Sequence, residues 1–448
     1  MTSQKVLGLG LAGAAGAAGI YFWRRSQAPV VVVGGGVMGL STAERLAAMG
    51  RKVLLLDENH PIRGSWGSTR ASHLRMEDPV LLHMGIFSIR RWQQLQEEYR
   101  AQHAGGDSLF YQRTGSMMAG PRKPIENLAH VIQREIPGPM GSLEVLDAAG
   151  AGQRFPQLQL AEEEKLLFMP EGYTMVVPTA LHCLHWAAAR SGVEYEEDAV
   201  VSIDRRSKTV TTRDGREIRY HKLVITAGPW TNKVLQSAQL DGLPMIVSNE
   251  QTVEFLAKDG APNHDWKEFP LFTWSEAGYK GRAEDGGCRY FYTTPHCPLP
   301  GSGSQGVKVG FHRQGPLLQT EDFLVTEQGE ACSARLPNIR KELRAQQEFD
   351  WDGFSLDAIQ QFLKSRLPGL DADHPVGFMR CLYQLTPDLQ MILGPHPQDS
   401  SVVLACGFSG SGFQFAPAIA DFLAALVAER KLSDLQGRML SKFDPTRF

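Results

Sequence analysis

The chain has 448 residues, a formal net charge of −3, 42% apolar residues and 21% charged residues. These values are ordinary for a globular protein with enough core for two or three domains, and the near-balanced charge excludes nucleic acid as the main partner. Its six cysteines are scattered without C-x-x-C spacing. We therefore expect neither a metal site nor a disulfide framework, and a reducing compartment fits.

The first predicted element is an apolar segment at residues 6–23. It carries no charge, is rich in Leu, Ala and Gly, and ends in Tyr21, Phe22 and Trp23, with Arg24 and Arg25 following. Eighteen helical residues span about 27 Å, close to the thickness of the hydrocarbon core. Aromatic and arginine residues at one end are typical of a membrane interface. We predict a single-pass membrane anchor in an unspecified membrane, with a cleaved targeting segment and a buried helix as the alternatives.

The next stretch organises the rest of the chain. Residues 30–33 are four consecutive valines, which predict a buried parallel strand. Gly34, Gly36 and Gly39 then form a G-x-G-x-x-G motif, followed by a predicted helix at 41–49 and a second apolar strand that ends at Asp57. This order is typical of a dinucleotide-binding unit, with phosphates at the helix N-terminus and the acid on a ribose hydroxyl. The alternative is a glycine-rich turn in an ordinary α/β unit.

The remaining elements follow in chain order. Helices are predicted at 80–98, 127–135, 178–191, 356–367 and 417–429. A strand, turn and strand are predicted within 109–118, and a short strand and helix within 143–155. An antiparallel meander is predicted from 194–196, 199–204, 209–213 and 217–220, and buried strands at 222–228 and 401–406.

Elements of the dinucleotide type thus occur at the start, near the middle and at the end of the chain, so the two predicted domains are discontinuous. We predict an α/β protein with a Rossmann-like cofactor-binding domain and a mixed, mainly antiparallel β substrate domain. The cofactor domain comprises residues 29–90, 175–240 and 376–448, and the substrate domain comprises 91–174 and 241–375. Residues 1–28 form the anchor or targeting segment and a linker.

The stretch 306–312 alternates as a strand. Lys308, Gly310 and His312 share one face, while Val307, Val309 and Phe311 share the other. A lysine and a histidine on one face of an apolar strand are unusual for packing alone, so both are candidate site residues. The alternatives are a surface lysine and a hydrogen-bonded core histidine.

From residue 30 to 448 the chain resembles the flavin-dependent amine oxidases related to monomeric sarcosine oxidase, N-methyltryptophan oxidase and pipecolate oxidase, in the wider D-amino-acid-oxidase-like group. The resemblance is carried by residues 34–39, 67–70, 227–230, 306–312, and 381–388 with 407–413. The first and third stretches are general to many flavoproteins. The last two are specific to this group in order and spacing.

The resemblance implies FAD as the cofactor. The residues implied to hold it are Gly34, Gly36, Val37, Met38, Gly39, Asp57, Ser68, Thr69, Arg70, Val200, Gly228, Trp230, Cys381, Gly407, Gly410, Gly412, Phe413 and Gln414. Cys381 matches the position at which the family attaches FAD through a thioether; the alternative is a buried cysteine that acts as a small apolar side chain. The loop at 407–412 would face the flavin's pyrimidine edge, and the alternative is a loop needed only for tight packing.

The resemblance also implies catalytic roles. Cationic Lys308 would stabilise superoxide, His312 and Tyr292 would line the substrate pocket, and Arg70 would lie beside the flavin. The family's carboxylate-binding arginine, three positions after Arg70, is His73 here, and Arg75 follows two positions later. Gln414 stands where sarcosine oxidase has a second cationic ligand. These departures predict a substrate different from or larger than sarcosine, with Arg75 as the candidate carboxylate ligand.

The predicted function is oxidation of the C–N bond of an amino-acid-like, N-substituted amine to an imine by a monomeric enzyme, with molecular oxygen reduced to hydrogen peroxide. One alternative is a dehydrogenase on the same fold that passes electrons to a quinone or carrier in the membrane. The other is an assembly or scaffold protein that keeps FAD for structure and does not turn over.

Overall fold

The computed structural model describes residues 28–60, 64–103, 109–276, 289–315, 317–318 and 353–448. The predicted anchor at 6–23 lies outside these ranges and stays a prediction. Within them, no helix combines the length and the apolar character that crossing a membrane requires.

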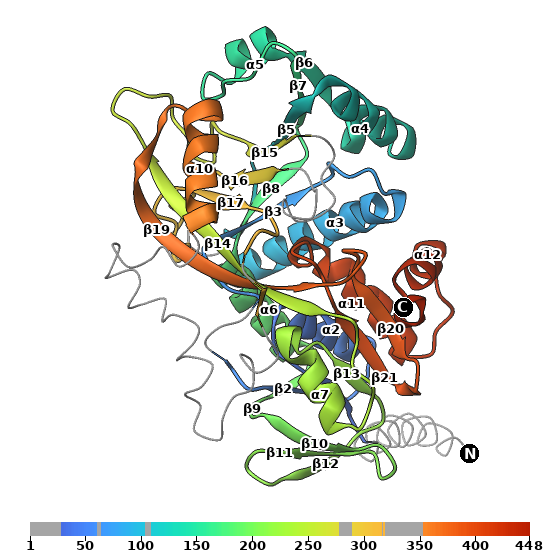
Figure 1. The fold of residues 1–448 in the computed structure, drawn as a ribbon. Coiled ribbons are helices and arrows are strands. Elements are labelled where there is room, and N and C mark those ends of the chain that lie inside the picture. The colour runs from blue at the N-terminus through green and yellow to red at the C-terminus, as the bar shows by residue number, and fades with distance from the viewer. Residues whose placement is uncertain (1–27, 61–63, 104–108, 277–288, 316, 319–352) are drawn as a thin grey trace, which may run out of the picture.

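The four consecutive valines form the centre of a sheet in the lower half of Figure 1. Among the described residues its six strands lie in the order β20 (Ile392–His396), β21 (Asp399–Cys406), β13 (Leu223–Ile225), β1 (Val30–Val33), β2 (Val53–Asp57) and β9 (Glu194–Glu197). Only the pair β20–β21 is antiparallel. The strands of this sheet therefore come from three separate parts of the chain.

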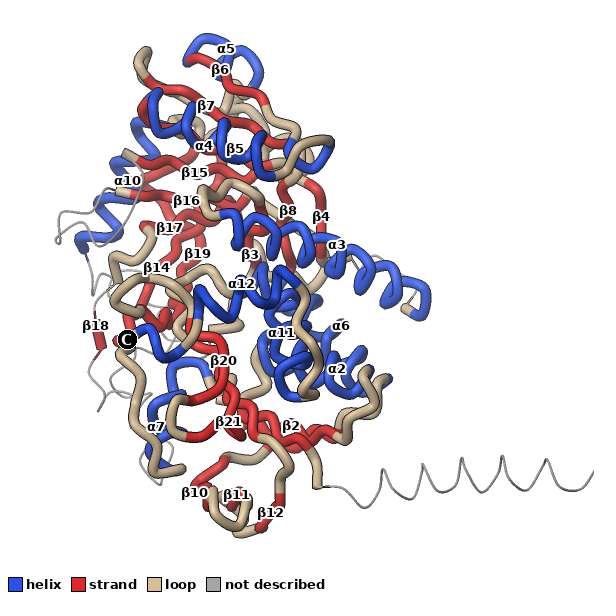
Figure 2. Tube along the Cα trace, turned by 90° about the vertical axis from the view of Figure 1, so that its right-hand side faces the viewer, coloured by secondary structure: helices blue, strands red, loops and turns tan. Residues whose placement is uncertain are grey.

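Both faces of this sheet are covered, which explains the uninterrupted apolar run. Val30 and Val32 contribute to the core shared with α2 (Val37–Ala48), α6 (Val177–Arg190) and α11 (Ala416–Val427), and Figure 2 shows these helices grouped together. Val31 and Val33 contribute to a separate core on the other face. That core includes residues of α7 (Thr231–Ser237) and of the antiparallel sheet β10 (Val200–Asp204), β11 (Thr209–Thr212) and β12 (Glu217–Arg219).

The larger sheet is mixed and mainly antiparallel, as predicted. Its path is β18 (Leu317–Leu318), β14 (Ile246–Ala257), β17 (Val307–Phe311), β16 (Tyr290–Thr294), β15 (Leu271–Ser275), β5 (Ser116–Pro121), β7 (Glu164–Met169) and β6 (Glu144–Asp147). Among the strand pairs that the described residues form in this sheet, only β15 and β5 are parallel. The long strand β19 (Leu370–Leu385) pairs with β14, and Figure 1 shows the two running together from the upper sheet toward the lower one.

The two faces of the larger sheet differ in character. Val253, Val307 and Phe311 point into an apolar core with α10 (Gly353–Arg366). The residues that alternate with them face the opposite side. The predicted division of faces on β17 is therefore confirmed, and it makes one side of the sheet available for polar groups.

The remaining elements frame that polar side. A small sheet contains β3 (Thr69–His73), β8 (Gly172–Val176) and β4 (Tyr111–Arg113). The helix α3 (Pro79–Gln102) contacts β3 and β4, and begins at Pro79 because the side chain of Asp78 accepts from the N–H groups of Val80 and Leu81. The other helices are α4 (Arg122–Glu135), α5 (Ala148–Arg154) and α12 (Asp434–Phe443), with 3₁₀ turns at Pro139–Gly141, Gly228–Trp230, Phe413–Phe415 and Pro445–Arg447.

The predicted α/β class is confirmed, but three local predictions were wrong. The strand at 194–197 is not part of the meander, since it pairs in parallel with β2 at the edge of the first sheet. The helix predicted from residue 41 begins at Val37, so Gly39 lies inside it. The helix predicted from residue 127 begins at Arg122. Strands β8 and β19 run across the predicted boundaries near residues 175 and 376, and the division into two domains stays a prediction.

Candidate active site

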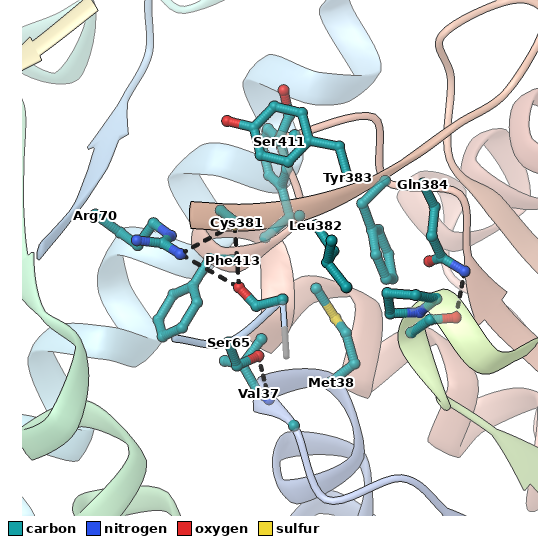
Figure 3. Close-up of a pocket in the computed structure, with 18 of the residues that line it drawn as sticks. Val37, Met38, Ser65, Arg70, Cys381, Leu382, Tyr383, Gln384, Ser411 and Phe413 are labelled. Atoms are coloured by element: carbon teal, nitrogen blue, oxygen red, sulfur yellow. Dashed lines mark hydrogen bonds between the residues drawn. The ribbon is translucent and has the colours of Figure 1, made fainter. Parts of the chain in front are cut away.

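A cavity of about 980 Å³ extends from the carboxyl ends of β1 and β2 to the polar face of the larger sheet. Its lining includes residues of β3, β16, β17 and β19, together with the loop before α11. A crevice at the carboxyl ends of parallel strands is where open α/β folds bind their ligands. Figure 3 shows part of the lining in close-up.

The glycine motif closes one end of the cavity. Gly34 has φ +102°, a conformation that favours glycine. A Cβ on Gly39 would lie 1.8 Å from the Gly34 carbonyl oxygen, so only glycine lets α2 approach β1 this closely. Gly36 provides no side-chain cap for α2, and the N–H of Val37 donates to Ser65 Oγ at 3.0 Å, as Figure 3 shows. The helix N-terminus and Asp57 thus border an open space that suits an anionic dinucleotide.

Arg70 and Cys381 meet beside Gly64, the neighbour of the Ser65 that contacts the start of α2. Arg70 Nη2 lies 3.5 Å from Cys381 Sγ and donates to the Gly64 carbonyl oxygen at 3.2 Å (Figure 3). Burial raises the pKa of the Cys381 thiol, while Arg70 opposes that shift. The arginine therefore favours the thiolate of a buried cysteine that lines the cavity.

Lys308 lies on the polar face of the larger sheet, as predicted. It is 3% exposed, lines the cavity and donates through Nζ to the carbonyl oxygen of Thr69. Burial lowers its pKa to about 7, Arg70 acts in the same direction, and Glu254 opposes the shift. The resemblance implied a cationic lysine, and this pKa leaves both protonation states populated near neutral pH.

An aromatic group surrounds His312. Its ring centroid lies 5.8 Å from that of Tyr292, 5.6 Å from that of Tyr383 and 5.3 Å from that of Tyr290. Burial lowers the pKa of His312 well below its ordinary value, so the ring is neutral at neutral pH. A Cβ on Gly410 would lie 2.3 Å from the Tyr383 ring, so only glycine fits beside this aromatic group.

The two departures from the family pattern, His73 and Gln414, lie together. Gln414 Oε1 accepts from the backbone N–H of His73 at 3.0 Å, which uses the side chain to join the loop before α11 to β3. Burial holds the pKa of His73 well below its ordinary value. Neither residue therefore supplies the positive charge found in the family.

Arg75 supplies a positive charge in this region instead. It is 6% exposed and lines the cavity, and its Nε and Nη1 have no hydrogen-bond partner among the described residues. Burial lowers the pKa of Arg75 to about 10, so the guanidinium stays charged at neutral pH. A buried charge without a partner is costly in free energy, and an anionic ligand would lower that cost.

Most of the predicted site residues line this single cavity. Those in the lining are Gly34, Gly36, Val37, Met38, Asp57, Arg70, Arg75, Val200, Gly228, Trp230, Tyr292, Lys308, His312, Cys381, Gly410, Gly412, Phe413 and Gln414. Gly39, Ser68, Thr69 and Gly407 lie behind the lining. Thr69 Oγ1 is 2.9 Å from Thr294 Oγ1, and Ser68 Oγ donates to Glu254 at 2.9 Å. Direct contact of these four with FAD stays a prediction.

Three residues of the site were not predicted. Tyr290 and Tyr383 could have been found from strand alternation, because each lies two positions from a predicted site residue on the same strand. Glu254 gave no such signal, since its position depends on pairing between β14 and β17. In the described part of the chain no group of His, Cys, Asp and Glu side chains could hold a metal ion.

Residues 29–426 match the family described as FAD dependent oxidoreductase. The chain belongs to this family. It is 26% identical over 421 residues to peroxisomal sarcosine oxidase of Homo sapiens, covering 92% of this chain and 95% of the relative. It is 25% identical over 413 residues to monomeric sarcosine oxidase of Bacillus sp. (strain B-0618), covering 90% and 92%. The predicted resemblance to the sarcosine oxidases is therefore confirmed.

The solved structures agree on the fold. NikD, described as an unusual amino acid oxidase essential for nikkomycin biosynthesis, superposes in its open form with a TM-score of 0.67 at 21% identity. The match covers 93% of this chain and 97% of that chain. Likeness at this identity shows the fold alone. The family establishes FAD as the cofactor, whereas attachment through Cys381 stays a prediction.

Proposed function

We propose that the protein is an oxidase that converts the C–N bond of an amino-acid-like, N-substituted amine into an imine. In the overall reaction the amine loses one hydrogen from carbon and one from nitrogen, and molecular oxygen gains both as hydrogen peroxide. The imine then hydrolyses. The observation that carries this proposal is the presence in one cavity of the glycine motif, Lys308 and the buried guanidinium of Arg75, whose Nε and Nη1 have no hydrogen-bond partner in the described part of the chain.

The described residues fit FAD. The N-terminus of α2 borders the cavity, and its N-cap residue Gly36 has no side chain in the way, which suits the pyrophosphate. Arg70, Cys381 and Lys308, which line the same cavity, would lie around the ring system. FAD, when bound, would accept the hydride equivalent from the carbon beside nitrogen. We further propose that Cys381 holds FAD through a thioether, supported by its position in the lining beside Arg70.

Arg75 is the proposed ligand of the substrate carboxylate. Its planar guanidinium can donate two parallel hydrogen bonds to a carboxylate, and its burial strengthens that interaction. Neighbouring His73 is neutral and Gln414 is uncharged and already hydrogen-bonded, so neither provides an equivalent positive charge.

The cavity also favours a substrate bulkier than sarcosine. Met76, Leu81, Met118 and Leu128 line it, coming from α3, α4, β5 and the loop after β3. These apolar side chains suit an apolar substituent on the substrate. We therefore propose an N-alkyl or cyclic secondary amino acid with an apolar side chain.

Only the unprotonated amine has the lone pair that the oxidation needs. Tyr292, Tyr383 and neutral His312 would position this amine without adding a charge. The rate at which the substrate reduces the flavin should therefore rise with pH as the substrate ammonium group loses its proton. Lys308, in its protonated form, would stabilise the negative charge that develops on oxygen.

The anchor at residues 6–23, the location at a membrane and the monomeric state also belong to the proposal. They rest on the sequence, because residues 6–23 lie outside the described ranges. An anchor would keep the alternative of a membrane-linked dehydrogenase open, and the electron acceptor must therefore be measured.

The test is an assay of full-length purified protein in mild detergent with a panel of amines. The panel contains sarcosine, N-methyl amino acids with larger apolar side chains, pipecolate and the matching amines without a carboxylate. We expect peroxide release, with larger N-methyl amino acids better than sarcosine and decarboxylated amines poor. Reduction of an added quinone or dye without peroxide would identify a dehydrogenase. A flavin that no amine on the panel reduces would contradict the proposal and favour the scaffold.

A further inference from the structure

Glu254 lies directly opposite Lys308 on the neighbouring strand and is 4% exposed. We propose that Glu254 is a positioning residue for Lys308, which fixes the amino group at the cavity wall and favours its charged form. This inference rests on the proposed function, because the oxygen reaction is the step that would use the charge.

The first support is a row of residues across three strands. Thr294 of β16 is the pairing partner of Lys308 of β17, and Lys308 is the pairing partner of Glu254 of β14. Side chains of directly paired residues lie on the same face of a sheet, with Cβ atoms about 5 Å apart. Lys308 and Glu254 are therefore neighbours on the polar face.

The second support is that each residue of the row contacts one of two adjacent residues, Ser68 just before β3 and Thr69 at its start. Thr294 Oγ1 is 2.9 Å from Thr69 Oγ1, and Lys308 donates to the Thr69 carbonyl oxygen. Glu254 Oε1 accepts from Ser68 Oγ at 2.9 Å. Glu254 and Lys308 are thus held by adjacent residues, and their relative position is fixed from two sides.

The third support is that Glu254 is kept away from the cavity. It is absent from the lining, and its second oxygen accepts from the backbone N–H of Gln305 at 2.7 Å. On the other edge of β14, Gly377 of β19 pairs with Glu254. A Cβ on Gly377 would lie 3.3 Å from the Glu254 carboxylate, so the glycine leaves room for that carboxylate. The carboxylate can therefore act on Lys308 without competing for a ligand in the cavity.

The charged and titratable groups that act on Lys308 come from three strands. Arg70 of β3 favours the neutral amine, whereas Glu254 of β14 and Cys381 of β19 favour the ammonium form. Burial itself favours the neutral form most strongly. Since the thiol of Cys381 is mainly protonated when buried, Glu254 is the main group that keeps the charge on Lys308.

The test compares wild type with Glu254→Gln, which keeps the shape and removes the charge. The first measurement is the pH titration of the Lys308 Cε signal by NMR in protein labelled with [¹³Cε]lysine, the signal being assigned from its absence in Lys308→Met. We expect the titration midpoint to fall by about one to three pH units in Glu254→Gln. The second is the reoxidation of photoreduced flavin by oxygen across pH, which should slow in the same variant at pH 7 and above.

A matched control is Glu164→Gln. Glu164 is also a buried carboxylate on a strand of the larger sheet, but it pairs with Arg366 and accepts from Trp274, and it is not part of the cavity lining. Both measurements should be unchanged in this variant. Glu254→Asp should restore part of the wild-type midpoint.

An unchanged Lys308 midpoint in Glu254→Gln overturns the inference. If that variant folds poorly, the double variant Glu254→Gln/Lys308→Met is compared with the two single variants. Removing both charges together should lower the free energy of unfolding by less than the sum of the two single changes. Additive effects would refute the pairing. Neither measurement needs an amine substrate, so a protein that oxidises no amine would refute the proposed function and still test this inference.

Discussion

Replacement of Arg75 by methionine should affect stability and catalysis in opposite directions. The guanidinium is buried with two nitrogen atoms unpartnered among the described residues, and its immediate neighbour along the chain is buried Leu74. Methionine is close to the apolar part of arginine in length and shape. The change therefore removes a charge and leaves little empty space.

The size of the stability change follows from the pKa. Burial lowers the pKa of Arg75 from 12.5 to about 10, and a shift of this size corresponds to about 3 kcal/mol against the charged form. Arg75→Met should raise the free energy of unfolding of the substrate-free protein by up to about 3 kcal/mol. In catalysis the variant would leave the substrate carboxylate without its charged partner. Removing one partner of a buried, hydrogen-bonded charge pair costs about 2–5 kcal/mol. Taken from the transition state, this cost corresponds to a loss in kcat/KM of about 30-fold to a few thousand-fold.

The assay is urea unfolding of the holoenzyme combined with steady-state peroxide release on the best amine of the panel. Arg219→Met, at an exposed position on β12, is the control for a general arginine-to-methionine effect. The matching amine without a carboxylate should react equally with wild type and Arg75→Met. If Arg75→Met keeps the wild-type kcat/KM for the carboxylate substrate, the assignment of Arg75 is wrong.

Three further predictions concern the cofactor and Lys308. In Cys381→Ser all flavin should remain in solution after acid precipitation, whereas wild type should carry its yellow colour into the pellet. Gly39→Ala should lose most bound FAD and unfold at lower urea, because the new Cβ would lie 1.8 Å from the Gly34 carbonyl oxygen. Burial lowers the pKa of Lys308 to about 7 from 10.5, so the unfolded chain binds more protons between these values. The free energy of unfolding should therefore rise with pH across this window, by up to about 1.4 kcal/mol per pH unit, and Lys308→Met should lack this rise.

Elements determined by local sequence were predictable. The four valines of β1 are buried because both faces of their sheet are covered. An uninterrupted apolar run is the sequence pattern of a strand that is buried on both faces. The alternation along β17 correctly predicted that Lys308 lies on the opposite face from Val307 and Val309, because one face of this strand packs in the core and the other lines the cavity. Each of these features depends on residues within a few positions of one another.

Features determined by distant pairing were not predictable. Strand β9 has exposed charged residues at an edge, so its pattern resembles a solvent-facing meander although its partner is β2. Glu254 is 186 positions from Ser68, whose hydroxyl donates to it, and no periodicity in the sequence indicates this contact. A shift of the cation from position 73 to Arg75 could be suspected from the sequence. That its Nε and Nη1 are buried with no hydrogen-bond partner among the described residues required the structure.

The arrangement of charge on the cavity wall connects the two proposals. Arg70, Arg75 and Lys308 line the cavity, whereas in the described parts of β3, β14, β16, β17 and β19 no acidic side chain does. Glu250 and Glu254 lie behind the wall and accept hydrogen bonds from backbone N–H groups, including that of Gln314 at 3.1 Å from Glu250. Cations at this part of the cavity would attract the carboxylate of the proposed substrate and disfavour an ammonium group beside it. The same charges that would bind the proposed substrate would therefore favour its unprotonated amine, the form from which the proposed oxidation starts.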